Sequence, residues 1–205
     1  RWRMLDTAYK RLPTETITQA PVDCTLALRE RVAARAGAGA ALPAVTRMRF
    51  LVEPVVANVA AERFARFGTP RTELQARFDL RFCTAAAWLR GRFTLAEMSE
   101  PAYTDAAILA LRGLVQVDAD QGRTLDGARL QMAFADGSEE EVEVPAFRGS
   151  AANPLTDDEL SGVFRATAEG SIPGEQAERV LAALWGLEGG GTTQALVAAT
   201  TGAPA

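Results

Sequence analysis

A lysine and a glutamate five residues apart near the start of the chain have side chains suited to proton transfer. Lys10 is the only lysine among 205 residues, and every other cation is arginine. The pKa of an ammonium falls on burial, whereas a guanidinium stays charged, so the two are not interchangeable in catalysis. Glu15, if buried beside Lys10, would be a general base or acid. The plainer interpretation is that both are solvated side chains of an irregular N-terminal segment.

Other polar residues extend this set toward recognition of an anion. Gln19 can hydrogen-bond a carboxylate but cannot move protons. We expect Asp23 to cap or start the helix that follows it. Asp79 precedes a run of small residues, and its carboxylate would repel an anionic substrate unless Arg77 or Arg81 offset the charge.

The composition excludes several kinds of chemistry. The chain has no histidine, so it can form no Ser-His-Asp or Cys-His pair and no histidine-ligated metal site. A formal charge of -4 and the lack of a basic run argue against nucleic acid as a partner. Cys24 and Cys83 lack CxxC spacing, which favours two buried thiols in a reducing, cytoplasmic compartment over a disulfide. The acidic run at residues 139–141 is interpreted as the solvated start of a strand rather than a metal site.

Nothing in the sequence predicts membrane insertion or export. The apolar stretch at residues 51–61 is interrupted by polar residues and proline, so it is not a membrane span. The chain begins at Arg1 without the pattern of a signal peptide, which suggests a fragment, a processed chain or an excised domain.

The periodicity predicts an α+β fold with a small, mostly antiparallel sheet, packed helices and a C-terminal helical pair. We expect an α+β domain over residues 1–152, returning helices over 153–190, and a tail or frayed helix over 191–205. The expected elements are an irregular segment at 1–19, a helix at 21–37 with Pro21 in its first turn, a strand at 45–52, a helix ending at Gly68, a small-residue helix at 80–89, a short helix before VQVDAD, a hairpin turning at Asp136 and Gly137, and helices starting at Thr156 and after Pro173. The last two helices carry more apolar area than a pair can bury by itself, so they need a partner surface.

Several motifs in order resemble the C-terminal half of the MmgE/PrpD family. They are YKRLP at 9–13, FDLRFCTAAAWLRG at 78–91, the Asp-Gly hairpin, and FRGSAANPLTDDELSGVFR at 147–165. The resemblance runs from about Tyr9 to Leu187. It implies a large N-terminal helical domain, not included in this chain, onto which the closing helices return. That domain would be supplied by the same polypeptide or by a separate subunit of an oligomer.

The resemblance also implies a function. Family activities include dehydration of 2-methylcitrate, decarboxylation of cis-aconitate and epimerisation of iminodisuccinate. They take place in a cleft between the two domains, on a small carboxylic acid, without metal or organic cofactor. A proton is removed next to a carboxylate, so such a site needs cations that hold carboxylates and a tuned base.

The resemblance places a lysine at position 10, histidines at 15 and 19, and an aspartate at 23. This chain has Glu15 and Gln19 at the histidine positions, and an aspartate at position 79 where the family often has serine. We therefore expect Lys10 and Glu15 to be catalytic, with no metal. The residues expected to bind substrate are Gln19, Asp79 and Arg81.

Two alternatives to catalysis remain. In the first, the fold persists as a structural or interaction subunit that has lost its chemistry with the histidines. In the second, the chain is an α+β binding module unrelated to the family, with its last helices folded onto its own sheet. Even in the catalytic interpretation, the isolated chain is expected to be inactive without its helical partner.

Overall fold

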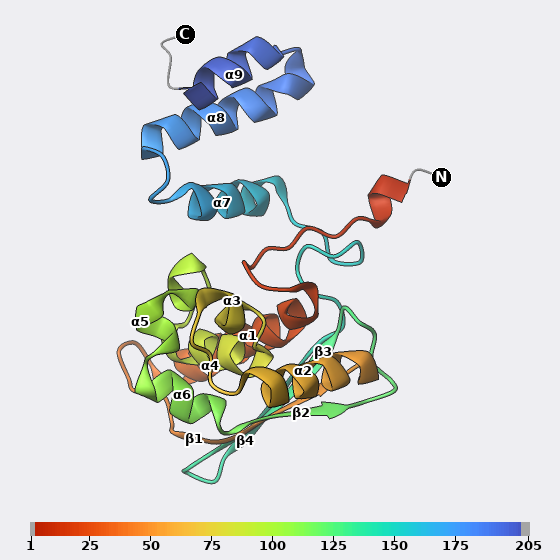
Figure 1. Cartoon of the computed structure of the whole chain (residues 1–205), viewed down its shortest axis with the longest axis vertical. Coiled ribbons are helices and arrows are strands. Elements are labelled where there is room, and N and C mark those ends of the chain that lie inside the picture. The colour runs from red at the N-terminus through yellow and green to blue at the C-terminus, as the bar shows by residue number, and fades with distance from the viewer. Residues whose placement is uncertain (1–2, 202–205) are drawn as a thin grey trace. The chain divides into compact units, whose positions relative to one another are not determined.

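A four-stranded sheet forms the base of the first of two units in the computed structural model, which describes residues 3–201 (Figure 1). The sheet unit spans Arg1–Pro154 and the helical unit spans Leu155–Ala205. The strand order is β2-β1-β3-β4. The strands are β1 Val45–Val52, β2 Val115–Ala119, β3 Ala128–Phe134 and β4 Glu139–Val144. β1 pairs with β2 in parallel and with β3 antiparallel, and β3 pairs with β4 antiparallel, so the sheet is mixed and the predicted α+β class is confirmed.

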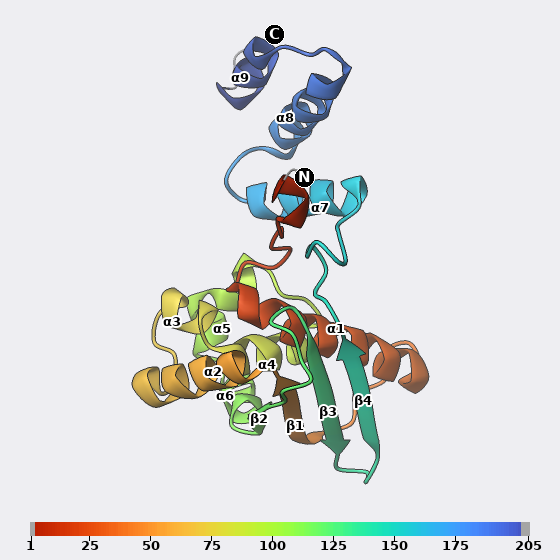
Figure 2. The ribbon, with the colours of Figure 1, turned by 90° about the vertical axis from the view of Figure 1, so that its right-hand side faces the viewer.

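Helices of the sheet unit pack on one face of this sheet (Figure 2). They are α1 Thr16–Ala36, α2 Pro54–Phe67, α3 Glu73–Arg77, α4 Leu80–Arg90, η2 Leu95–Met98, α5 Glu100–Tyr103 and α6 Ala106–Arg112; the short η1 Arg3–Asp6 precedes them in the chain and is not part of this layer. Helix α4 is the most deeply buried, because alanines and other small residues allow α1 and α6 to approach it closely. It ends as predicted at Gly91, which is in the left-handed region that favours glycine.

Alternation along the strands gives the sheet its apolar face. Met48 and Phe50 in β1 are fully buried and lie opposite Met132 and Leu130 in β3. Since successive side chains of a strand point to opposite faces, the residues between them lie on the other side of the sheet.

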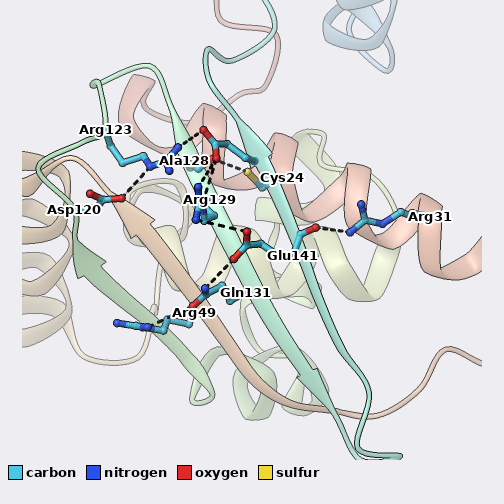
Figure 3. A network of polar contacts seen from close by, with 10 residues as sticks. Cys24, Arg31, Arg49, Asp120, Arg123, Ala128, Arg129, Gln131 and Glu141 are labelled. Atoms are coloured by element: carbon cyan, nitrogen blue, oxygen red, sulfur yellow. Dashed lines mark hydrogen bonds and ion pairs between the residues drawn. The ribbon is translucent and has the colours of Figure 1, made fainter.

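That other side carries a ladder of polar contacts (Figure 3). Arg49 donates to Gln131 at 3.4 Å, and Gln131 donates to Glu141 at 2.8 Å. Arg129 forms an ion pair with Glu141 at 3.6 Å, while Arg31 from α1 donates to the Glu141 backbone carbonyl at 2.5 Å. The charges of the acidic edge strand are thus balanced by arginines of its neighbours, as cross-strand pairing favours.

The start of α1 differs from the prediction. The sequence predicts an irregular segment up to residue 19 with Pro21 in the first helical turn, but the helix begins at Thr16 and contains Pro21 in its interior. Thr18 and Gln19 are buried, so tertiary packing extends the helix backward. Pro21 is the sixth residue of this helix, where it removes one backbone hydrogen bond of the helical series.

Both cysteines are buried free thiols, as predicted. The Cys24 thiol donates to the Ala128 carbonyl at 3.3 Å, and burial raises its pKa to about 12. The Cys83 thiol donates to the Ala76 carbonyl at 3.3 Å, and burial likewise raises its pKa. Neither is a thiolate at neutral pH, so neither is an activated nucleophile.

The helical unit consists of α7 Asp157–Ala168, α8 Gly174–Gly186, η3 Leu187–Gly189 and α9 Thr193–Thr201. Thr156 caps α7 in a reciprocal capping box with Glu159, as the sequence predicts. Arg165 in α7 forms a two-point ion pair with Glu178 in α8, at 2.6 and 2.9 Å. The Trp185 indole donates to the Ser161 hydroxyl at 3.0 Å, a second link between these helices. Within residues 3–201, no helix is both long enough and apolar enough to cross a membrane.

Candidate functional site

The loop before α1, residues 7–15, is held in place by the side chain of Gln19. The Gln19 carbonyl oxygen accepts the Leu12 backbone N–H at 3.1 Å, and its NH₂ group donates to the Leu12 carbonyl at 2.9 Å. Gln19 is 1% exposed, so these bonds are shielded from water. The structure thus places this expected substrate-binding residue beneath the loop, with its amide bonded to the chain itself.

Asp23 forms a second attachment for the same loop. Its carboxylate pairs with Arg11 at 2.5 Å and accepts the Arg148 backbone N–H at 2.8 Å. The expectation that Asp23 caps or starts α1 is wrong, because the helix begins seven residues earlier, after Glu15. Its side chain joins the loop to the chain segment that follows β4.

Glu15 lies at the N-cap position of α1, but its side chain does not cap the helix. Instead its carboxylate forms an ion pair with Arg63 of α2 and accepts a long hydrogen bond of 3.5 Å from the Thr18 hydroxyl. The Glu15 side chain is 12% exposed. Burial raises the pKa of Glu15, and Arg63, Thr18 and Lys10 oppose this only in part. A carboxyl with a raised pKa is a better proton acceptor than an ordinary surface glutamate.

Lys10 is on the same loop and is exposed. Its positive charge acts on Glu15 from a distance and lowers the pKa of that carboxyl by a small amount. Burial beside Lys10 is the condition expected from the sequence for Glu15 to act as a base, but Lys10 is exposed and Arg63 is the direct partner of Glu15.

Asp79 caps α4 and is neutralised by an arginine distant in sequence. One carboxylate oxygen accepts the Phe82 N–H at 3.0 Å, and the other forms an ion pair with Arg112 of α6 at 2.7 Å. Arg112 also donates to the Gly68 carbonyl at 2.5 Å. The sequence predicts Arg77 or Arg81 as the offsetting charge, but Arg77 pairs with Glu73 and Arg112 takes this role.

Arg81 lies over an aromatic ring. Its guanidinium carbon is 3.8 Å from the ring centroid of Phe64, and that of Arg112 is 4.8 Å from the same ring. Arg63 lies in the same way over Phe78, at 4.9 Å. We call these five residues the arginine–aromatic cluster.

Arg81 differs from the other two arginines of the cluster in having no carboxylate partner within residues 3–201. Its Nε is buried without a hydrogen-bond acceptor in that part of the chain. Burial lowers the pKa of the Arg81 guanidinium, Asp79 raises it, and the like charge of Arg112 lowers it again. Because arginine stays charged at neutral pH, Arg81 is a half-buried cation suited to an incoming anion.

The structure therefore brings Glu15, Asp79 and Arg81 to one region of the sheet unit, while Gln19 lies under the loop that carries Lys10. Sequence reasoning missed the other four members of the arginine–aromatic cluster. They come from α2, from α6 and from the end of α3, and only the arginine and phenylalanine content of ERFARF at 62–67 pointed toward them.

No group of three or more potential metal ligands from cysteine, histidine, aspartate and glutamate is assembled within residues 3–201. The cluster offers cations instead, which suit carboxylate or phosphate groups.

Comparison with known proteins gave one family match. Residues 12–187 match the MmgE/PrpD C-terminal domain. The matched range covers most of the sheet unit together with α7 and α8, and leaves α9 outside it. Glu15, Gln19, Asp79 and Arg81 lie within this range, whereas Lys10 lies two residues before it. A search of curated proteins gave no significant match.

Proposed function

Because this chain belongs to the MmgE/PrpD family through its C-terminal domain, we propose that it is the C-terminal part or subunit of a lyase or isomerase. Its reaction is removal of a proton next to a carboxylate of a small organic acid, without a metal. The observation that carries this proposal is a carboxyl of raised pKa, Glu15, close to a cluster that contains the unpaired cation Arg81. The family match excludes the interpretation of an unrelated α+β module.

In this proposal the Glu15 carboxylate accepts the proton from the carbon atom. The electron pair left on that carbon is delocalised into the adjacent substrate carboxylate, whose charge Arg81 stabilises. Lys10, exposed on the loop, supplies a donor for the leaving or returning group. Gln19 and Asp79 contribute by positioning: Gln19 fixes the loop that carries Lys10 and Glu15, and Asp79 fixes the start of α4 and orients Arg112.

A helical partner completes the site in this proposal. The helical unit leaves large apolar side chains exposed, and these are Leu160, Leu184, Leu187 and Val197. Exposed apolar side chains such as these are candidates for contact with another protein. We propose a helical domain of the family as that protein, in a cytoplasmic oligomer, and expect the chain to be inactive without it.

The proposal is tested by exchange of substrate hydrogen for solvent deuterium. The chain assembled with a helical-domain partner is incubated in D₂O with a panel of di- and tricarboxylates, and NMR follows deuterium uptake next to each carboxylate. Glu15→Gln should slow the exchange by about 100-fold or more, because it removes the proton acceptor. Lys10→Ala should lower overall turnover more than it lowers the exchange.

The matched control is Glu30→Gln, which changes an exposed glutamate of the same helix and should leave exchange unchanged. If the assembly exchanges no hydrogen in any acid of the panel, or if Glu15→Gln exchanges at the original rate, the proposal is wrong.

A non-catalytic subunit is the second candidate function. One observation favours it: the carboxylates of Glu15 and Asp79 each pair with an arginine, and the Gln19 amide is bonded to the chain's own backbone. In that case these polar groups only stabilise the fold. Calorimetric titration with the same acids distinguishes the catalytic from the non-catalytic function, since a structural subunit should bind none of them even at millimolar concentration.

A further inference from the structure

The ion pair between Glu15 and Arg63 is built so that it can exchange partners. We propose that a carboxylate of the substrate replaces Glu15 on Arg63, and that this exchange releases Glu15 to act as the base. The inference rests on the proposed function. It adds Arg63 as the residue that both binds the substrate and couples binding to proton transfer.

The placement of the arginines suits such an exchange. Arg63 of α2 and Arg81 of α4 each lie over an aromatic ring, at 4.9 Å from the Phe78 centroid and 3.8 Å from the Phe64 centroid. A guanidinium over an aromatic ring can still bind a carboxylate through its N–H groups. Arg63 and Phe64 are successive residues of α2, so this helix supplies one guanidinium of the cluster and the ring that carries another.

The charges of the cluster favour entry of an anion. Arg63 is matched by Glu15 and Arg112 by Asp79, which leaves the charge of Arg81 in excess. An arriving carboxylate is therefore attracted to the cluster. At Arg63, its negative charge repels Glu15 and competes with it for that guanidinium.

Glu15 is the more easily displaced of the two carboxylates. Asp79 is held by the Phe82 N–H at 3.0 Å and by two nitrogens of Arg112, each at 2.7 Å. Apart from Arg63, the contact of Glu15 is a hydrogen bond of 3.5 Å from the Thr18 hydroxyl. An anion in the cluster should accordingly move Glu15 and leave Asp79 in place.

Displacement also prepares Glu15 for its reaction. Its proton affinity is set by burial, which favours the neutral form, and by Arg63, Thr18 and Lys10, which favour the ionised form. The buried Cys83 of α4 would interact with Glu15 as a thiolate, but it is a neutral thiol and so adds no charge. Removing Arg63 from Glu15 therefore strengthens the base, and the proton moves from carbon to the Glu15 oxygen as the electron pair passes to the substrate.

The test is an NMR titration of the side-chain carboxyl carbon of Glu15 in the full chain, with succinate as the probe and Glu15→Gln to assign the signal. Succinate should bind saturably and raise the pKa of Glu15. Arg63→Gln should weaken succinate binding about 10- to 100-fold, as loss of a charged hydrogen bond does, and the remaining binding should no longer change the pKa of Glu15. The matched control is Arg66→Gln, an exposed arginine on the same helix, which should behave as the unaltered chain.

Three results would overturn the inference: succinate that binds equally well to the Arg63→Gln variant, succinate that binds without raising the pKa of Glu15, and no saturable binding to the full chain. Arg63→Lys provides a second variant if Arg63→Gln fails to fold, since it keeps the charge and should retain weaker binding. The deuterium exchange of the assembly reports on the proposed function separately, so either can fail without the other.

Discussion

Two buried glutamates of this protein have pKa values shifted in opposite directions, and their hydrogen bonds explain why. Burial alone raises the pKa of both. Glu97 accepts the Thr94 backbone N–H and the Thr94 hydroxyl, both at 2.7 Å, and the Arg92 guanidinium at 2.9 Å, which together lower its pKa below the ordinary value. Glu15 has fewer such contacts, the ion pair with Arg63 and a 3.5 Å hydrogen bond from Thr18, so burial prevails there.

Glu97→Gln is predicted to destabilise the sheet unit at neutral pH by about 1–2 kcal/mol, the usual effect of losing a capping interaction. Because the pKa of Glu97 is lowered in the folded state, its contribution is present above the ordinary glutamate pKa and is lost as the pH falls through the folded value. The difference between the two proteins should therefore shrink below about pH 4. Urea unfolding at a series of pH values measures it, and a difference that persists in acid would contradict this account.

At this scale the sequence singles out polar residues better than it predicts their contacts. It singles out Glu15 and Asp79, but the capping of α4 by Asp79 is not among its predictions. The partners, Arg63 and Arg112, are 48 and 33 residues away and approach only when α2 and α6 pack beside α4. No local pattern specifies such a pairing, because it depends on tertiary structure.

At the scale of elements, the hairpin of β3 and β4 shows how a turn sets a register. Gly137 has a φ of +85°, a conformation that residues with a side chain rarely adopt. Asp136 accepts the Ser138 N–H at 2.9 Å and its hydroxyl at 2.6 Å, which fixes the turn from within. The strands leave this turn with Met132 opposite Glu140.

Gly137→Ala should lower the free energy of unfolding by about 1 kcal/mol, because alanine is strained at this φ. Gly162→Ala provides the contrast: this glycine lies inside α7 with open space around it, and alanine there should stabilise by about 0.5–1 kcal/mol. Thermal unfolding of both variants measures the effects. Equal effects of the same sign would show that backbone conformation does not decide them.

The long elements could be predicted from sequence, whereas the start of α1 and several short helices could not. Periodic apolar residues predict β1, β3 and α4, and the terminal glycines predict where α2 and α4 end. Helices α3 and α5 have five and four residues, too short to show a period. The backward extension of α1 depends on burial of Thr18 and Gln19, which is a property of packing.

At the scale of the whole molecule, the two units differ in how much they bury. The sheet unit has a continuous core that includes fully buried aromatic residues such as Phe50, Phe82 and Phe147. In the described part of the helical unit, the buried apolar residues are Ala177, Val180 and Leu181, and α9 has none. The helical unit therefore has less apolar burial to stabilise it.

Hydrogen exchange should show this difference directly. Backbone amides of α9 should exchange at least about 100-fold faster than those of α4 or β3, since local opening needs little free energy where few apolar contacts are lost. A bound helical-domain partner should slow exchange in α7 and α8 and leave β3 unchanged. Equal protection of α9 and α4 in the free chain would contradict the prediction.

The bonds of Gln19 to Leu12 also limit how this chain can change over evolutionary time. The family resemblance predicts histidine at position 19. In this protein the Gln19 amide accepts a hydrogen bond from the Leu12 N–H and donates one to the Leu12 carbonyl. The two nitrogens of an imidazole point in diverging directions, so histidine would leave at least one of these groups unsatisfied, at about 1–3 kcal/mol. We therefore expect Gln19→His to destabilise the loop at residues 7–15 unless other residues change with it.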